Sequence, residues 1–523
     1  MNPISVNLPQ MLTQPATAGV SIRNAEPVAA TPTSNTNVDL SQANRSPAPD
    51  TYNRNGTLGD GQVRYIWEQD GIDKLSMRML SAVQSSSAAS RFQGLGAALL
   101  EQLSTNGGQR ISQSGLAIAL GTTGEPALLG LQQARLRQYA SDSVTFTLTS
   151  ASGATVSLGL YSSDNGLAVD ADVQGGSLSA DELKSLAALA DSFQSAVDGL
   201  TAEPPTLQLG NLVKLDPSLF TGMKLDASIH TASGSLQTFA LNIDDQTRSL
   251  SLKSPSGEVK MHFDTQGGAL LGSQSQRQAA VANYLEQFDA AQKRGNGDEK
   301  MMGLFKDAFR QLNSVDDTGT QSARHDLPSN RMSRLLLSGL ADFDASLNQT
   351  EQQINPMHRE EVDHFDYSVS QSTSLKGGTS NLTVQQDQQA TLKAAWHKGL
   401  NPLTDLVLSL DSKSQNYRYH EVDDQASSST RLAFANNRLV EATATQQASK
   451  QERVRTYQEA ELLSDVTTTS DAEQSRNLLD MLEDLIGQDR QARRMGIASG
   501  LEQQLQALQP LWLLQADPAQ IRE

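Results

Sequence analysis

Residues 364–378 read HFDYSVSQSTSLKGG and residues 381–396 read NLTVQQDQQATLKAAW, and this stretch decides the fold class. In its first half, Phe365 and Tyr367 alternate with polar residues, a period of two that is typical of a β-strand with one buried face. Gly377-Gly378 ends that run, and glycine is common in the turns between antiparallel strands. The pattern predicts a long β-hairpin with one apolar face and one face of Ser, Thr and Gln.

Further strands are expected on both sides of this hairpin. Downstream, Tyr417 and Tyr419, then Leu432 and Phe434, continue the alternation. Upstream, segments 144–193 and 227–288 each hold several short alternating runs followed by an amphipathic helix. Two explanations fit this similarity: a duplicated β-meander-plus-helix unit, or small-residue turns that coincide by chance.

We therefore expect an α+β, multidomain protein built from antiparallel β-meander and hairpin units with amphipathic helices. Its first residues are rich in Asn, Thr, Ser, Ala and Pro and hold too few apolar residues to offset the entropy of ordering. The predicted segments are a disordered tail at 1–62, a short helical region at 63–140, an α+β region at 141–313 with two candidate repeats, a linker at 314–330, a helix plus antiparallel β domain at 331–462, and C-terminal helices at 463–523.

Helix starts are predicted where a capping box precedes an apolar stripe. Ser179 with Glu182, and Ser470 with Glu473, have the required S-x-x-E spacing. Helices are also expected at about 298–313 and, as a shorter element, from Leu335 to Leu347.

Composition excludes several classes of protein. The chain has 523 residues, no cysteine, and 41 Lys+Arg against 59 Asp+Glu, which gives a formal net charge of −18. Without cysteine there can be no disulfide scaffold, thiolate zinc site, iron–sulfur cluster or cysteine nucleophile. The negative charge disfavours nucleic acid as the main ligand, because affinity for phosphate backbones depends on Lys and Arg.

The sequence shows no membrane or Sec-targeting signal. It contains no run of about 18 apolar residues, so no transmembrane segment is expected. Its first residues, MNPISVNLP, lack the basic and apolar regions of a Sec signal peptide. We expect a soluble protein that is cytoplasmic or exported by a non-Sec route.

Glutamines cluster in the predicted strands and in the C-terminal region, at Gln385-Gln386, Gln388-Gln389, Gln446-Gln447 and Gln503-Gln504. On the open face of a strand, glutamine could support pairing with the edge of another chain. The simpler interpretation is a soluble surface.

The densest titratable segment is 357–366, which reads MHREEVDHFD. In a helix, Glu361 and His364 would share a face with His358 one turn back, an arrangement that is half of a carboxylate–histidine metal site. In a strand, His364 would share a face with Asp366 instead. The interpretation without a site is a charged, solvated approach to the hairpin. The sequence has no P-loop, nucleophile elbow or H-E-x-x-H motif.

Two further histidines, His397 and His420, lie in the same β region and could converge with His364 in the fold. The candidate catalytic residues are thus His358, Glu361, His364, His397 and His420, with Glu361 and His364 as candidate metal ligands. No cofactor is predicted. The alternative for each residue is an ordinary place in the core or on the surface.

The best candidate for a partner-binding surface is an apolar stripe near the end of the chain. Leu501, Leu505, Leu508 and Trp512 lie on one side of a predicted helix. This stripe could dock on the rest of the chain or on a partner helix.

Three functional hypotheses follow. The first is a non-enzymatic interaction or structural protein that binds a protein partner, or itself, through the C-terminal β region and helices. The second is a metal-dependent or acid/base hydrolase using histidines of the 358–420 region. The third is a small-molecule or lipid carrier.

Overall fold

Alternating apolar and polar residues build a long antiparallel sheet in the computed structural model of this chain. The structure describes residues 63–69, 73–85, 87–119, 126–266, 270–317, 328–351, 354–378 and 380–522. These residues belong to one compact unit, Gly61–Glu523. The predicted disordered tail, 1–62, lies outside the described residues. Helices and strands both occur throughout the unit, which confirms the α+β class.

Fifteen strands of the described residues form one sheet, and every neighbouring pair is antiparallel. The order across the sheet is β1-β2-β5-β4-β3-β6, and from β6 to β15 it follows the chain. The strands are β1 Val63–Trp67, β2 Ile111–Ala119, β3 Asp142–Ser150, β4 Thr155–Ser163, β5 Gly166–Gln174, β6 Phe220–His230, β7 Leu236–Ile243, β8 Thr247–Ser254, β9 Gly257–Asp264, β10 Asp342–Gln349, β11 His364–Gly378, β12 Asn381–Gly399, β13 Tyr417–Ala435, β14 Arg438–Gln458 and β15 Glu461–Asn477.

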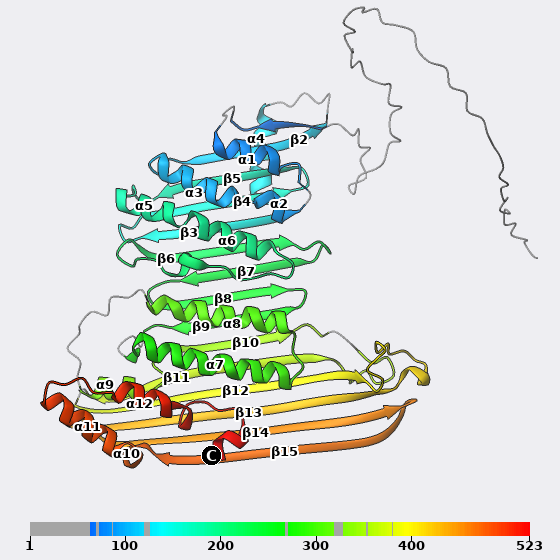
Figure 1. The fold of residues 1–523 in the computed structure, drawn as a ribbon. Helices are drawn as coiled ribbons and strands as arrows, with labels where there is room; N and C mark the ends of the chain where they lie inside the picture. Colours follow the sequence, from blue (N-terminus) through cyan, green and yellow to red (C-terminus); the bar gives the residue numbers. More distant parts are fainter. Residues whose placement is uncertain are drawn as a thin grey trace, which may run out of the picture. The chain divides into compact units, whose positions relative to one another are not determined.

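Most helices lie on one face of this sheet (Figure 1), whereas α4 (Pro126–Gln138) packs on the opposite face, where Arg137 donates to the hydroxyl of Ser112. The α-helices of the described residues are α1 Lys74–Ala82, α2 Ala88–Phe92, α3 Leu95–Thr105, α4 Pro126–Gln138, α5 Ala180–Ala188, α6 Ala190–Thr201, α7 Gln274–Arg294, α8 Glu299–Ser314, α9 Pro328–Leu336, α10 Leu478–Met481, α11 Glu483–Arg494, α12 Leu501–Leu508 and α13 Pro518–Arg522. Short 3₁₀ helices are η1 Gly210–Val213, η3 Val315–Asp317, η4 Ser412–Ser414 and η5 Gln509–Leu511. In Figure 1, α3, α6, α8 and α7 follow one another across the sheet, and α9 to α12 gather at one end of the longest strands.

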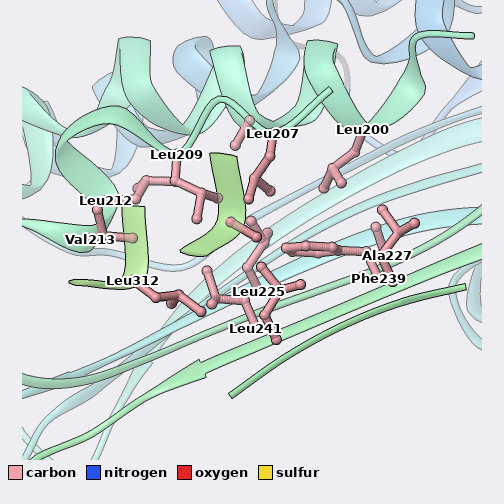
Figure 2. Packing of buried hydrophobic residues seen from close by; sticks show 14 of the residues in the cluster. Leu200, Leu207, Leu209, Leu212, Val213, Leu225, Ala227, Phe239, Leu241 and Leu312 are labelled. Atoms are coloured by element: carbon pink, nitrogen blue, oxygen red, sulfur yellow. The ribbon is translucent and has the colours of Figure 1, made fainter. Parts of the chain in front are cut away.

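The main core lies between these helices and the strands. In β6 and β7, Leu225 and Leu241 point towards the helices, while the residues between them face the other side of the sheet. Figure 2 shows Leu200 of α6 above Phe239 and Leu312 of α8 on the side of Leu225 and Leu241, in the same cluster. Each large aliphatic side chain buried in this way contributes about 1.5–3 kcal/mol relative to an exposed one.

The opposite face of the central sheet is polar. One row of paired residues crosses it from Asp226 on β6 through Lys260 on β9 and Thr391 on β12 to Asp471 on β15. Over β6 to β12 this face forms a hollow of about 760 Å³. A polar second face is the usual arrangement for an antiparallel sheet that is covered on one side.

The predicted hairpin is confirmed. β11 and β12 pair in register from His364 opposite Ala395 to Gly378 opposite Asn381. Gly377 has φ 104°, and a Cβ added to it would collide with the carbonyl oxygen of Asn381. The turn therefore requires glycine at this position. The expected antiparallel strands beyond it are confirmed as β13 and β14.

Two helix predictions are confirmed by their caps. Ser179 and Glu182 form the predicted capping box of α5. The helix expected at 298–313 is α8, and the side chain of Asp298 caps its first turn. The following linker, predicted at 314–330, lies largely outside the described residues. The segments 144–193 and 227–288 each place antiparallel strands before helices, and a duplication stays a prediction.

The region predicted as helical at 63–140 contains the short helices α1 to α4 together with strands β1 and β2. Two other local predictions are wrong. The short helix expected from Leu335 to Leu347 ends with α9, because Gly339 has φ 74° and β10 follows. The capping box predicted at Ser470 lies within β15, where the β-branched run before it pairs with β14.

A single sheet runs through the predicted segments 63–140, 141–313 and 331–462. Whether these segments fold separately stays a prediction. Within the described ranges, none of the helices combines the length and apolar character of a membrane span.

Candidate functional site

The fold brings two of the five candidate catalytic residues together. Glu361 lies in the turn before β11, and His397 lies near the end of β12. The Nε2 atom of His397 is 3.4 Å from Oε2 of Glu361, and both side chains are fully buried. This pair is the centre of the candidate site.

The local chain conformation explains the position of Glu361. Its N–H donates to the carbonyl oxygen of His358 (2.9 Å), and its own carbonyl accepts from the N–H of Asn355 (3.2 Å). An isolated bridge between Ile354 and Val362 closes the same turn. These bonds direct the carboxylate of Glu361 inwards, beneath the ends of β12, β13 and β14.

His397 is held from both sides of its ring. Its Nδ1 is 2.5 Å from Oδ1 of Asp363, whose carboxylate also accepts the N–H of His397 at 3.0 Å. Its Nε2 faces Glu361. Both ring nitrogens are therefore engaged by carboxylates, as expected for a protonated imidazole.

Two further side chains complete the contacts of Glu361. The hydroxyl of Tyr417 donates to Oε2 at 2.6 Å. The Nη1 atom of Arg455 lies 3.3 Å from Oε1, and its Nη2 lies 3.2 Å from Glu421. The guanidinium of Arg455 also lies over the ring of Tyr419, 5.1 Å from the centroid. We call Glu361, Asp363, His397, Tyr417 and Arg455 the buried polar centre.

The charges of the buried polar centre shift the pKa values of its members. Burial alone would raise the pKa of Glu361, but hydrogen bonds from His397 and Tyr417 and the charge of Arg455 lower it overall. Burial alone would lower the pKa of His397, but its bonds to Asp363 and Glu361 raise it overall. The carboxylate and the imidazolium therefore stabilise each other's charged forms.

The other candidate residues lie in separate contacts. His358 packs on the ring of Tyr457, with 5.0 Å between centroids. His364 is the first residue of β11, and its Nδ1 contacts the carbonyl of Val362 at 3.0 Å. Of the helix and the strand considered for this residue, the structure shows the strand. His420 stacks on Trp396 and its Nδ1 lies 3.0 Å from Glu452.

The candidate metal ligands Glu361 and His364 do not form the helical i,i+3 pair, because the segment is a turn followed by a strand. In the part of the chain that the structure describes, no three His, Asp or Glu side chains are grouped to hold a metal ion. The arrangement is thus a buried network of ion pairs, whose net contribution to stability is small because each charge loses its hydration.

Residues 400–416 form a loop beside the buried polar centre. Leu406 and Leu408 pack on Ala395, Tyr417, Tyr419 and Tyr457. Between and around them, Leu403, Val407 and Leu410 point to solvent, with 90%, 73% and 76% of their surface exposed. The loop is therefore anchored by one set of aliphatic residues and presents a second set outwards.

Hydrogen bonds connect this loop to the turn between β14 and β15. The side chain of Asn355 donates to Oε1 of Gln415 (2.8 Å) and to the hydroxyl of Tyr417 (2.7 Å). The N–H of Ala460 donates to the carbonyl of Gln415 (3.3 Å), and that of Glu459 to the side chain of Asn416 (3.1 Å). The loop, the buried polar centre and the turn are one connected structure.

Strand β15 continues from this turn and is the last strand of the sheet. Among the described residues it pairs with β14 alone. Leu462, Leu463 and Val466, near its start, are 52%, 57% and 56% exposed. We call the exposed residues of the loop and of β15 the apolar rim: Leu403, Val407, Leu410, Leu462, Leu463 and Val466.

The predicted partner-binding stripe packs within the chain. Leu501, Leu505 and Trp512 are buried, and Leu508 is partly buried, in a second apolar cluster. The indole N–H of Trp512 donates to the carbonyl of Leu336 at 2.8 Å. Of the two alternatives given by the sequence, the structure shows docking on the same chain.

Several of the clustered glutamines are buried rather than on a surface or an edge. Gln386 accepts the N–H of Ser338 at 3.0 Å, and Gln388 accepts the N–H of Leu514 at 2.7 Å. The side chain of Gln446 donates to the carbonyl of Pro510 at 3.0 Å. These glutamines satisfy main-chain groups of the segments that cross the strands.

Sequence reasoning missed most of the buried polar centre. Asp363 stood in the titratable segment but was not singled out, and Asn355 and Arg455 carried no signal. Arg455 is 94 positions from Glu361 along the chain and becomes its neighbour only through strand pairing. The aromatic pair Tyr417 and Tyr419 was recognised only as strand residues.

Comparison of the chain with protein-family models, with curated protein sequences and with solved structures finds no match.

Proposed function

We propose that this chain is a non-enzymatic interaction or structural protein, and that a protein partner binds at the apolar rim. The observation that supports this most directly is the exposure of Leu403, Val407 and Leu410 on an anchored loop. Three exposed aliphatic side chains within one short loop are more than the single, scattered ones that soluble proteins commonly expose.

The free energy available at the rim is sufficient for a specific complex. Covering one large aliphatic side chain contributes about 1.5–3 kcal/mol. A few such residues at the centre of an interface usually provide most of its affinity. The rim supplies six of them at one end of the sheet.

The base of the rim favours binding because it is already ordered. Leu406 and Leu408 anchor the loop, and Gln415 ties it to Asn355 and to the β14–β15 turn. A partner would therefore spend little of its binding energy on ordering the loop.

The hydrolase alternative has weaker support. A general base needs a nitrogen or oxygen that can reach substrate. The side chain of His397 is fully buried and both of its ring nitrogens face carboxylates. No observation on the described residues favours the carrier alternative: the hollow of about 760 Å³ is on the open face of the sheet, and another, beside α7, has about 170 Å³.

The test compares two triple variants, each of which replaces three exposed apolar residues with lysine. The rim variant is Leu403→Lys with Val407→Lys and Leu410→Lys. The control is Met77→Lys with Leu128→Lys and Leu131→Lys, three exposed residues on α1 and α4. Both are used with the wild-type chain in a crosslinked capture from the native source, with quantification of each captured protein.

We expect the wild type and the control to enrich the same partner, and the rim variant to lose it by about tenfold or more. Sedimentation velocity on the pure proteins identifies self-association in the same series. Equal capture by all three proteins, with equal sedimentation, would contradict the proposal.

A further inference from the structure

Strand β15 presents a long open edge. The eleven residues from Glu461 to Asp471 are all exposed. In the described part of the sheet, no strand pairs with their outer side. An edge of this kind has main-chain N–H and C=O groups that point away from β14 and can pair with another strand.

Three of the usual protections of an edge strand are absent from β15, and its register shift lies near its start, opposite Thr456 and Tyr457. Edge strands are commonly blocked by lysine, by proline, or by being short. The sequence of β15, ELLSDVTTTSDAEQSRN, has neither residue type, and the strand is 17 residues long. The opposite edge of the sheet, β1, has only 5 residues.

The two faces of β15 differ in chemistry. Beyond the register shift opposite Thr456 and Tyr457, successive side chains alternate between faces, so Asp465, Asp471 and Glu473 lie on one face. Glu461, before the shift, pairs with Gln458 and lies on the other face. The other face carries Val466 and Ala472, and Ala472 is buried in the main core. Because Arg476 is the only basic residue of the strand, its formal net charge is −3.

A second copy of the chain fits this edge poorly. In a two-fold antiparallel pair, each register is defined by the residue on the axis. Like charges directly opposite each other destabilise such a pair. In two of these registers an acidic residue of one copy lies opposite an acidic residue of the other. With Thr468 or Thr469 on the axis, Asp465 lies opposite Asp471 or Glu473, respectively.

We infer that β15 receives an extended, basic segment of a partner protein, which adds to the sheet as a further strand. In that segment Lys or Arg alternates with aliphatic residues, so that the basic side chains lie on the face of Asp465, Asp471 and Glu473 and the aliphatic ones on the face of Val466. The Asp465 carboxylate is paired with Arg453 of β14, and the other acidic residues extend the charge along the strand. The inference rests on the proposed function and specifies its binding mode.

The probe for this inference is a set of synthetic peptides of about nine residues, the length of a typical strand or slightly more. The first alternates lysine and valine. The second alternates glutamate and valine. The third is the lysine–valine peptide with N-methyl groups on alternate main-chain nitrogens, which keeps the charge but removes main-chain donors. Binding to the full chain is measured by fluorescence anisotropy, and its location by hydrogen exchange.

We expect the lysine–valine peptide to bind and to slow exchange of amides between residues 461 and 471. The N-methylated and glutamate–valine peptides should bind at least about tenfold more weakly. The variant Glu461→Lys with Glu473→Lys should reverse the preference between the charged peptides. Lysine substitutions at Glu258 and Asp366, exposed or half-exposed on β9 and β11, serve as the control and should leave it unchanged.

Three results would overturn strand addition: equal binding of the N-methylated peptide, exchange protection confined to other strands, or protection of residues 461–471 by dimerisation of the chain alone. Failure of the proposed function is distinguishable. If the rim variant loses the native partner while the Glu461→Lys/Glu473→Lys variant keeps it, the rim binds the partner without strand addition. If both variants keep the partner, the proposed function itself is contradicted.

Discussion

The two ends of the longest strands are closed in different ways. At one end, Val384 and Leu432 pack with Leu336 and Trp512 in an apolar cluster. At the other end, the same strands β12 to β14 carry the tyrosines, His397 and Arg455 of the buried polar centre. Both ends are buried, and both hold a loop or C-terminal segment against the sheet.

The difference shows what each kind of contact can provide. Apolar burial stabilises in proportion to the area removed from water and tolerates small shifts of position. A buried ion-pair network adds little net stability, but removing one member leaves the other charges buried without a partner. The apolar end therefore holds the C-terminal segment, and the polar end fixes the loop that carries the rim.

The largest expected effect is at the apolar end. Trp512→Ala removes a fully buried indole and its hydrogen bond to Leu336. It should lower the free energy of unfolding by about 3–5 kcal/mol. Chemical denaturation followed by circular dichroism measures this loss. An effect as small as that of an exposed substitution would show that the C-terminal segment is not part of the cooperative fold.

A smaller loss is expected at the polar end. Glu361→Gln keeps the size of the side chain but leaves the charges of His397 and Arg455 without their shared carboxylate. The expected loss is about 2–3 kcal/mol of unfolding free energy. The same denaturation experiment applies, with Glu360→Gln as the control, because the Glu360 side chain is 67% exposed. Equal stability of the two variants would show that the Glu361 carboxylate does not stabilise the fold.

The pH dependence distinguishes the two ends further. The pKa of His397 is raised above its ordinary value of 6.5. Its contribution to stability is therefore fully present below pH 6.5 and is lost as the pH rises through the raised pKa. The pKa of Glu361 is lowered from 4.5, so its contribution is present above pH 4.5 and is lost as the pH falls through the lowered value.

The measurement is the stability difference between wild type and His397→Gln across this range. It should shrink as the pH rises above 6.5, since only the wild type then loses the imidazolium that faces Glu361 and Asp363. Trp512→Ala should show no comparable trend, because the indole does not titrate. A difference between wild type and His397→Gln that is independent of pH would contradict the assignment of a charged histidine.

The smallest expected effect is on the rim itself. Leu403→Ser changes a side chain that is 90% exposed, so the free energy of unfolding should change by less than about 0.5 kcal/mol. Thermal unfolding measures this. A loss of more than about 1 kcal/mol would mean that Leu403 is covered in the free protein, and it would remove this residue from the rim.

Local patterns were enough to predict the hairpin of β11 and β12, the capping box of α5 and the helix α8. In each case the deciding residues are neighbours in the sequence: alternating Phe365 and Tyr367, the glycines at the turn, and Ser179 with Glu182. The same reasoning was wrong for Ser470 and Glu473, whose capping-box spacing lies within a strand. There, pairing with β14 outweighed the local preference.

The sequence by itself determined the α+β class, the absence of cysteine chemistry, the negative charge and the two-faced pattern of many strands. It could not determine that Glu361 meets His397 and Arg455, that Gln388 and Gln446 are buried, or that Trp512 docks on the same chain. The tertiary structure decided these points, because each depends on contacts between residues far apart in the chain. A period of two identifies the face on which a residue lies, whereas only the order and register of the strands decide which residue lies beside it.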